Sequence, residues 1–125
     1  MANKTRVLVV DDEPGIRKLL AFELDFLGYE TVTMENADEA LALLRKSPPF
    51  DLIITDVRMP GSMDGIDLIQ SYREDRPEQN VIFITGYAAE EKLKDALKNP
   101  LNSCLKKPFQ IQELSVSMSK FLQAK

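Results

Sequence analysis

The chain has 125 residues, of which 44% are hydrophobic and 29% are charged, and its formal net charge is -4. This length predicts one domain spanning residues 1–125 with a single core. The acidic balance argues against nucleic acid as a partner of this domain, because phosphate contacts need an excess of Lys and Arg. No apolar stretch approaches membrane-spanning length, so we expect no membrane partner. The single cysteine and the absence of a signal-peptide core favour the cytoplasm.

Histidine is absent from the sequence. Ser-His-Asp and Cys-His triads are therefore excluded, and so are imidazole ligands to a metal. Any chemistry on a histidine must come from a partner protein.

Short apolar runs alternate with amphipathic segments along the chain. The apolar runs predict β-strands at residues 6–10, 30–34, 51–55, 80–84 and 103–106. The intervening segments predict helices at 14–27, from 36 or 37 to 46, at about 66–74 and at 88–98, and a last helix from residue 111 to residue 122. Pro14 suits a first helical turn, Gly28 suits a C-cap and Asn36 suits an N-cap.

This alternation predicts an α/β fold with a doubly wound, five-stranded parallel sheet and helices on both faces. We expect the flavodoxin-like strand order 2-1-3-4-5. The alternative order 3-2-1-4-5 belongs to dinucleotide-binding folds, which need a Gly-rich turn after the first strand. Here that turn begins with Asp11, Asp12 and Glu13, which repel phosphate unless a divalent cation intervenes.

Residues suited to phosphoryl chemistry follow four of the predicted strands: Asp11 with Asp12, Asp56, Thr85 and Lys107. The carboxyl ends of parallel strands meet at one edge of the sheet, so these side chains should share a pocket. Carboxylates without histidine suit Mg²⁺. Asp56 could then act as a nucleophile toward phosphorus, with Mg²⁺ and Lys107 neutralising charge.

Each of these residues also has an ordinary structural interpretation. Asp11 and Asp12 suit the start of the helix at Pro14. Asp56 could be a polar strand end, Thr85 is a common strand residue, and Lys107 could be a solvated surface lysine.

The chain resembles the receiver domain of two-component response regulators from about residue 6 to residue 122. The resemblance rests on five short blocks in one order and spacing: residues 9–14, 51–60, 63–65, 84–87 and 107–109. It implies that Asp56 is the phosphoacceptor and that Thr85 and Lys107 contact the phosphoryl group. It also implies that Mg²⁺ binds Asp11, Asp12, Asp56 and the backbone carbonyl of Arg58, and that the Lys107–Pro108 bond is cis.

The resemblance further implies partners and a switch. The donor would be a phosphohistidine on a sensor histidine kinase or a histidine phosphotransfer protein. The domain would catalyse its own phosphorylation and dephosphorylation without being a conventional enzyme. Phosphorylation would change the surface of the fourth helix, fifth strand and fifth helix, which could also form a homodimer, and a downstream protein or fused output domain would respond.

The sequence departs from the family at Cys104, where receivers usually carry an aromatic residue that couples to the threonine. We hypothesise that Tyr87 takes over part of this role. Arg58 and Tyr87 flank the predicted phosphate, and their bulk predicts slow hydrolysis of the phosphorylated form.

Three other functions are compatible with parts of this pattern. A pseudo-receiver would act by protein contacts without phosphorylation. A Mg²⁺-dependent phosphatase with an Asp nucleophile needs an Asp-x-Asp motif after the first strand, whereas Asp11 and Asp12 are adjacent. A flavodoxin-like binding module would need a phosphate loop rich in Ser, Thr or Gly.

Overall fold

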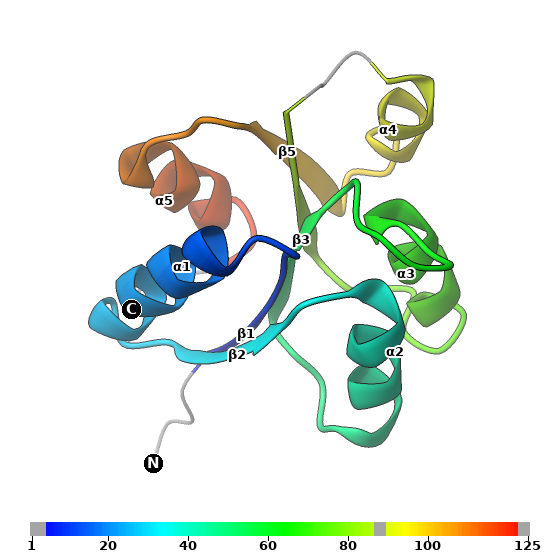
Figure 1. Cartoon of the computed structure of the whole chain (residues 1–125), viewed down its shortest axis with the longest axis horizontal. Helices are drawn as coiled ribbons and strands as arrows, with labels where there is room; N and C mark the ends of the chain where they lie inside the picture. Colours follow the sequence, from blue (N-terminus) through cyan, green and yellow to red (C-terminus); the bar gives the residue numbers. More distant parts are fainter. Residues whose placement is uncertain (1–4, 87–89, 123–125) are drawn as a thin grey trace.

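The computed structural model describes residues 5–86 and 90–122. In this part of the chain, parallel strands form a 5-stranded sheet in the order β2-β1-β3-β4-β5. The strands are β1 (Arg6–Val10), β2 (Glu30–Met34), β3 (Leu52–Asp56), β4 (Val81–Thr85) and β5 (Asn102–Lys106). The helices are α1 (Pro14–Phe26), α2 (Ala37–Lys46), α3 (Gly65–Tyr72), α4 (Glu91–Ala96) and α5 (Ile111–Ser119). The predicted fold class and strand order are confirmed (Figure 1).

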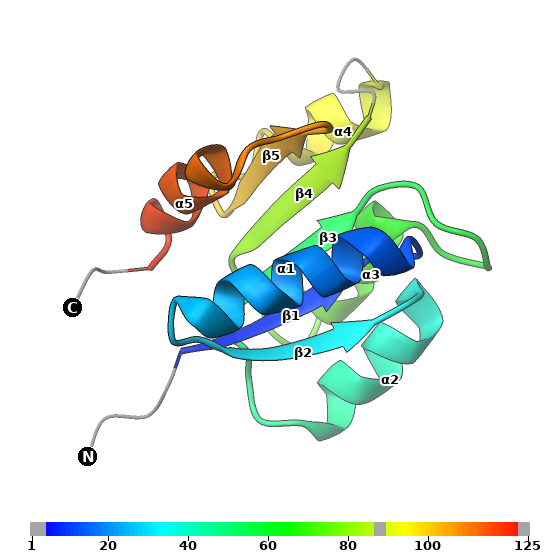
Figure 2. The same ribbon diagram turned by 60° about the vertical axis from the view of Figure 1, so that its left-hand side comes forward.

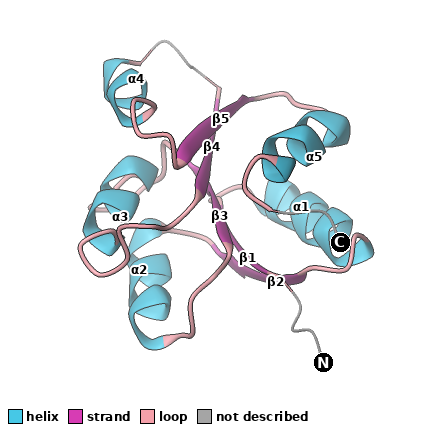
Figure 3. Cartoon of the chain, turned by 180° about the vertical axis from the view of Figure 1, so that it is seen from behind, coloured by secondary structure: helices cyan, strands magenta, loops and turns pink. Residues whose placement is uncertain are grey.

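The sheet lies between two layers of helices. Helices α1 and α5 cover one face, and α2, α3 and α4 cover the other (Figure 3). In β1, Val7 and Val9 belong to the core under α1 and α5, whereas Leu8 and Val10 belong to the opposite core. Successive side chains of a strand point to opposite faces, so a strand buried on both faces is apolar throughout.

Local sequence signals explain several element ends. Gly28 has φ +94°, a left-handed conformation that glycine adopts without steric cost, directly after the C-cap of α1. Asn36 caps α2 by accepting a hydrogen bond from the Glu39 N–H at 2.8 Å. Asp64 and Asp67 form a capping box that starts α3 at Gly65, one residue earlier than predicted.

Helix α4 is shorter than the predicted helix over 88–98. It ends at Ala96, because the N–H groups of Lys98 and Asn99 bond to carbonyls only three residues back, which tightens the chain before Pro100. Residues 88 and 89 of the prediction lie outside the described residues. No helix in the described ranges is long and apolar enough to cross a membrane.

Candidate phosphoryl and metal site

The carboxyl edge of the sheet gathers the predicted site residues. Asp56 ends β3, Thr85 ends β4, and Asp11 and Lys107 follow β1 and β5 directly. The backbone N–H of Lys107 donates to the Thr85 carbonyl at 2.7 Å, and Thr85 is buried. Strand register therefore fixes the predicted hydroxyl and ammonium residues next to each other. The Lys107–Pro108 peptide bond is cis, as the resemblance implied.

Asp11, Asp12 and Asp56 form one acidic cluster. Each offers a carboxylate oxygen, and these oxygens lie within 4.8 Å of one another. Asp11 is 1% exposed, and its Oδ1 accepts a hydrogen bond from the Glu13 N–H at 2.9 Å. Its Oδ2 is buried and accepts no hydrogen bond. An unsatisfied buried carboxylate oxygen beside two further carboxylates suits a hard divalent cation, so the residues fit the implied Mg²⁺.

Lys107 is the cation that faces this cluster. Its Nζ lies 3.2 Å from Asp56 Oδ2, 3.4 Å from Asp11 Oδ2 and 2.6 Å from Glu13 Oε1. Its side chain is 19% exposed. The interpretation of Lys107 as a solvated surface lysine is therefore wrong. Glu13 was missed as a contact of the site, although its position directly after the acidic pair was a signal.

The electrostatics of the site are dominated by burial. Burial raises the pKa of Asp11 above its ordinary value, although the hydrogen bond from Glu13 and the charge of Lys107 act in the opposite direction. Burial also raises the pKa of Asp56, and the negative charge of Asp11 adds to that effect. Burial lowers the pKa of Lys107, but the contacts with Glu13 and Asp56 outweigh it, and the net pKa is raised. Keeping these carboxylates ionised in the pocket therefore costs free energy, and a bound cation would reduce that cost.

The start of α3 packs directly against the backbone of Asp56. The Gly65 N–H donates to the Val57 carbonyl at 2.8 Å. A Cβ at Gly65 would lie 2.0 Å from the Asp56 carbonyl oxygen, so this position has room only for glycine. The Thr55 hydroxyl donates to the same carbonyl at 2.9 Å. These contacts hold the β3 end, and with it the Asp56 carboxylate, in place.

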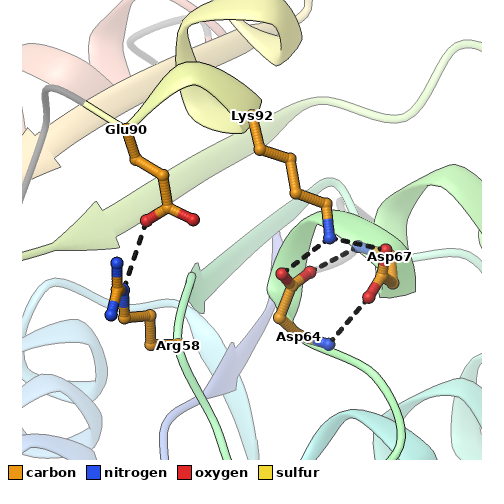
Figure 4. Close-up of polar contacts among 5 residues, drawn as sticks. All are labelled: Arg58, Asp64, Asp67, Glu90 and Lys92. Carbon is orange, nitrogen blue, oxygen red and sulfur yellow. Dashed lines mark hydrogen bonds and ion pairs between the residues drawn. The ribbon is translucent and has the colours of Figure 1, made fainter.

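Ion pairs connect the loop after β3 and the start of α3 with the N-cap and first turn of α4 (Figure 4). Arg58 Nε lies 3.2 Å from Glu90 Oε2, and the Arg58 side chain is 69% exposed. Lys92 Nζ lies 2.8 Å from both Asp64 Oδ2 and Asp67 Oδ1. The loop after β3 is thereby tied to the start of α4. Sequence reasoning missed this link, because its partners are 25 to 32 residues apart.

The structure also bears on the predicted helix cap at Asp11 and Asp12 and on Cys104. The N-cap of α1 is Glu13 and makes no side-chain cap, so neither Asp11 nor Asp12 is the N-cap of this helix. Cys104 is half-buried in β5 opposite Phe83, and burial raises the pKa of its thiol. Tyr87 lies outside the described residues.

The model of the response regulator receiver domain family matches residues 7–119. The chain belongs to this family. Among curated proteins, it is 37% identical to the response regulator protein PilR of Pseudomonas aeruginosa over 90% of the chain. It is 34% identical to the response regulator receiver protein CpdR of Brucella abortus over 95% of the chain and 98% of that protein.

Solved receiver structures have the same fold. The chemotaxis protein CheY4 of Vibrio cholerae aligns with TM-score 0.86 and 30% identity, over 96% of this chain and 100% of that one. The response regulator TrrA of Thermotoga maritima, solved in complex with Mg(2+)-BeF, aligns with TM-score 0.81 and 35% identity, over 94% and 99% of the two chains. The chain spans only 25% of the length of PilR and of the AtoC protein of Escherichia coli.

Membership in this family makes the chain a receiver domain of two-component signalling. It does not support the phosphatase or the flavodoxin-like binding module. The receiver interpretation now rests on the complete set of edge residues as well as on the short sequence blocks.

Proposed function

We propose that this receiver accepts a phosphoryl group on Asp56 from a phosphohistidine of a sensor histidine kinase or phosphotransfer protein. An Asp56 carboxylate oxygen attacks phosphorus, the bond between phosphorus and the donor imidazole nitrogen breaks, and an acyl phosphate forms. The observation that carries the proposal is the position of Lys107 Nζ, 3.2 Å from Asp56 and 3.4 Å from Asp11 at the edge of the sheet.

The carboxylates of Asp11, Asp12 and Asp56 and the backbone carbonyl of Arg58 would hold Mg²⁺. The ion would offset the negative charge of the carboxylates and of the incoming phosphoryl oxygens. The buried Oδ2 of Asp11, which accepts no hydrogen bond and lies 3.4 Å from the Lys107 ammonium, supports this assignment. The TrrA complex with Mg(2+)-BeF supports it by similarity.

Lys107 and Thr85 would carry the signal away from Asp56. Phosphorylation adds roughly -1.5 to -2 charge at this point. The Lys107 ammonium, which now contacts Glu13 and Asp56, would turn toward the phosphoryl oxygens. The Thr85 hydroxyl, which can donate a hydrogen bond, would likewise be drawn toward a phosphoryl oxygen. We propose that the surface of α4, β5 and α5 responds, with Tyr87 replacing part of the aromatic step lost at Cys104, and that a downstream protein or fused output domain reads it in the cytoplasm.

Acetyl phosphate with Mg²⁺ tests the proposal without the unknown kinase. We expect the wild type to gain the mass of one phosphoryl group and Asp56→Asn to gain none. Asp95→Asn is the matched control, because Asp95 is a 78% exposed carboxylate paired only with Lys98 in the described part of the chain. Equal labelling of Asp56→Asn would mean that another residue accepts the phosphoryl group and would overturn the assignment of Asp56. No labelling of the wild type by acetyl phosphate or by a phosphorylated histidine donor would favour the pseudo-receiver.

A further inference from the structure

An exposed apolar stripe runs along the outer face of α1. Among the described residues, the large apolar side chains with the highest exposure include Phe26 at 80% and Phe22 at 69%, and Leu19 is 45% exposed. The core side of the helix is formed by Leu20 and Leu24, both 0% exposed. Successive residues of a helix are rotated by about 100°, so Phe22 lies opposite Leu20 and Leu24 and points away from the sheet. Leu19 and Phe26 lie together on one side of Phe22. Figure 2 shows α1 lying across β1 and β2 with this outer side uncovered.

Asp25, in the last turn of α1, opposes the helix dipole. A helix favours acidic residues in its first turn and basic residues in its last turn, and α1 has neither. Instead, Lys18 lies toward the N-terminal end, Asp25 lies in the last turn, and both are exposed. An acidic residue in the last turn is unfavourable within its own helix. The charges of Lys18 and Asp25 become complementary when a second copy of the helix lies antiparallel to the first.

We propose that the unphosphorylated chain forms a two-fold symmetric dimer through antiparallel α1 helices, with Phe22 on the axis. A rise of about 1.5 Å per residue puts Lys18 about 6 Å to one side of Phe22 and Asp25 about 4.5 Å to the other. Two-fold rotation therefore places Lys18 of one copy opposite Asp25 of the other. Their positions along the helix axis then differ by only about 1.5 Å.

The same operation aligns the apolar residues. Leu19 lies about 4.5 Å from the axis and Phe26 about 6 Å, so Leu19 of one copy meets Phe26 of the other. Lys18 and Asp25 share one flank of the helix, whereas Leu19 and Phe26 share the opposite flank. A two-fold axis normal to the plane of the paired helices keeps each flank on its own side. The interface would thus have an aromatic centre, one apolar flank and one flank of two ion pairs.

This dimer differs from the predicted one through α4, β5 and α5. On those elements, the large exposed apolar side chain in the described ranges is Val116, at 63%. Val116 on α5 is therefore a matched control for Phe22 on α1. The proposal does not rest on phosphoryl transfer, because it is argued from the exposure and the charges of α1.

Sedimentation velocity over a concentration series tests the dimer. We expect the mass of the wild type to rise with concentration toward twice the 14.2 kDa of one chain. Phe22→Asp should weaken association at least about tenfold, and Val116→Asp should not. Acetyl phosphate labelling of Phe22→Asp should match the wild type, which checks the fold.

Charge reversal tests the antiparallel register. Lys18→Glu and Asp25→Lys should each weaken the dimer, and the double variant should restore it. Within one helix these residues are about 10 Å apart along the axis, so rescue must come from the second copy. A wild type that stays monomeric at every concentration, association of Phe22→Asp equal to that of the wild type, or a double variant as weak as the singles would each overturn the proposal. A monomer would leave the stripe for a different partner, such as a helix of the phosphoryl donor.

Discussion

Replacing Gly65 by alanine should both destabilise the fold and slow phosphorylation. The added Cβ would lie 2.0 Å from the Asp56 carbonyl oxygen. Cβ atoms in proteins essentially never approach another heavy atom to less than 3.0 Å, so α3 or the end of β3 must move by about 1 Å or more. Both partners are backbone, and no flexible side chain can turn away. Overpacking of this kind costs about 1–3 kcal/mol, and rigid neighbours place this case at about 3 kcal/mol.

Urea unfolding measures the stability, and the rate of acetyl phosphate labelling measures the site. Displacing Asp56 by about 1 Å should slow labelling by up to about 100-fold. Gly15→Ala is the matched control, since a Cβ there meets nothing within 4 Å and Gly15 lies in α1. That variant should gain about 0.5–1 kcal/mol. If Gly65→Ala unfolded at the wild-type urea midpoint, the close approach of α3 to Asp56 would be refuted.

Three further predictions concern the site and its surroundings. Asp11 has a raised pKa in the folded chain, so the stability it contributes is present below its ordinary pKa of 3.8 and is lost as pH rises. At pH 7 with EDTA, Asp11→Asn should therefore unfold at a higher urea concentration than the wild type, and this difference in urea midpoint should shrink toward pH 3. Mg²⁺ at 100 times its dissociation constant should stabilise only the wild type, by about 2.7 kcal/mol. Lys92→Met should lower the free energy of unfolding by at most about 1 kcal/mol, because the ion pairs of Lys92 are partly exposed. It should also raise the pKa of Asp67, which the hydrogen bond from Lys92 lowers. An unchanged titration of the Asp67 carboxyl group by NMR would contradict this. Tyr87→Ala should reduce the phosphorylation-dependent NMR shifts of α4 and β5, and unchanged shifts would remove Tyr87 from the proposed switch.

Local pattern determined the elements and the edge on which the chemistry lies. Continuous apolar runs indicated strands buried on both faces, and parallel strands end at one edge. Asp56 and Lys107 could therefore be assigned to one pocket from their positions after strands, although 51 residues separate them. The family resemblance added their roles, and the comparisons confirmed the family.

Contacts that depend on how the elements pack were decided only by the tertiary structure. The bond of Lys107 to Glu13 spans 94 residues, and the overlap that a Cβ at Gly65 would make depends on how α3 approaches β3. The exposure of Phe22 was equally hidden, because aromatic residues in a helix are as compatible with a core as with a surface. Periodicity reports the type of an element and one apolar face. Which side chains meet, and which apolar residues stay uncovered, follows from strand order, register and the packing of helices on the sheet.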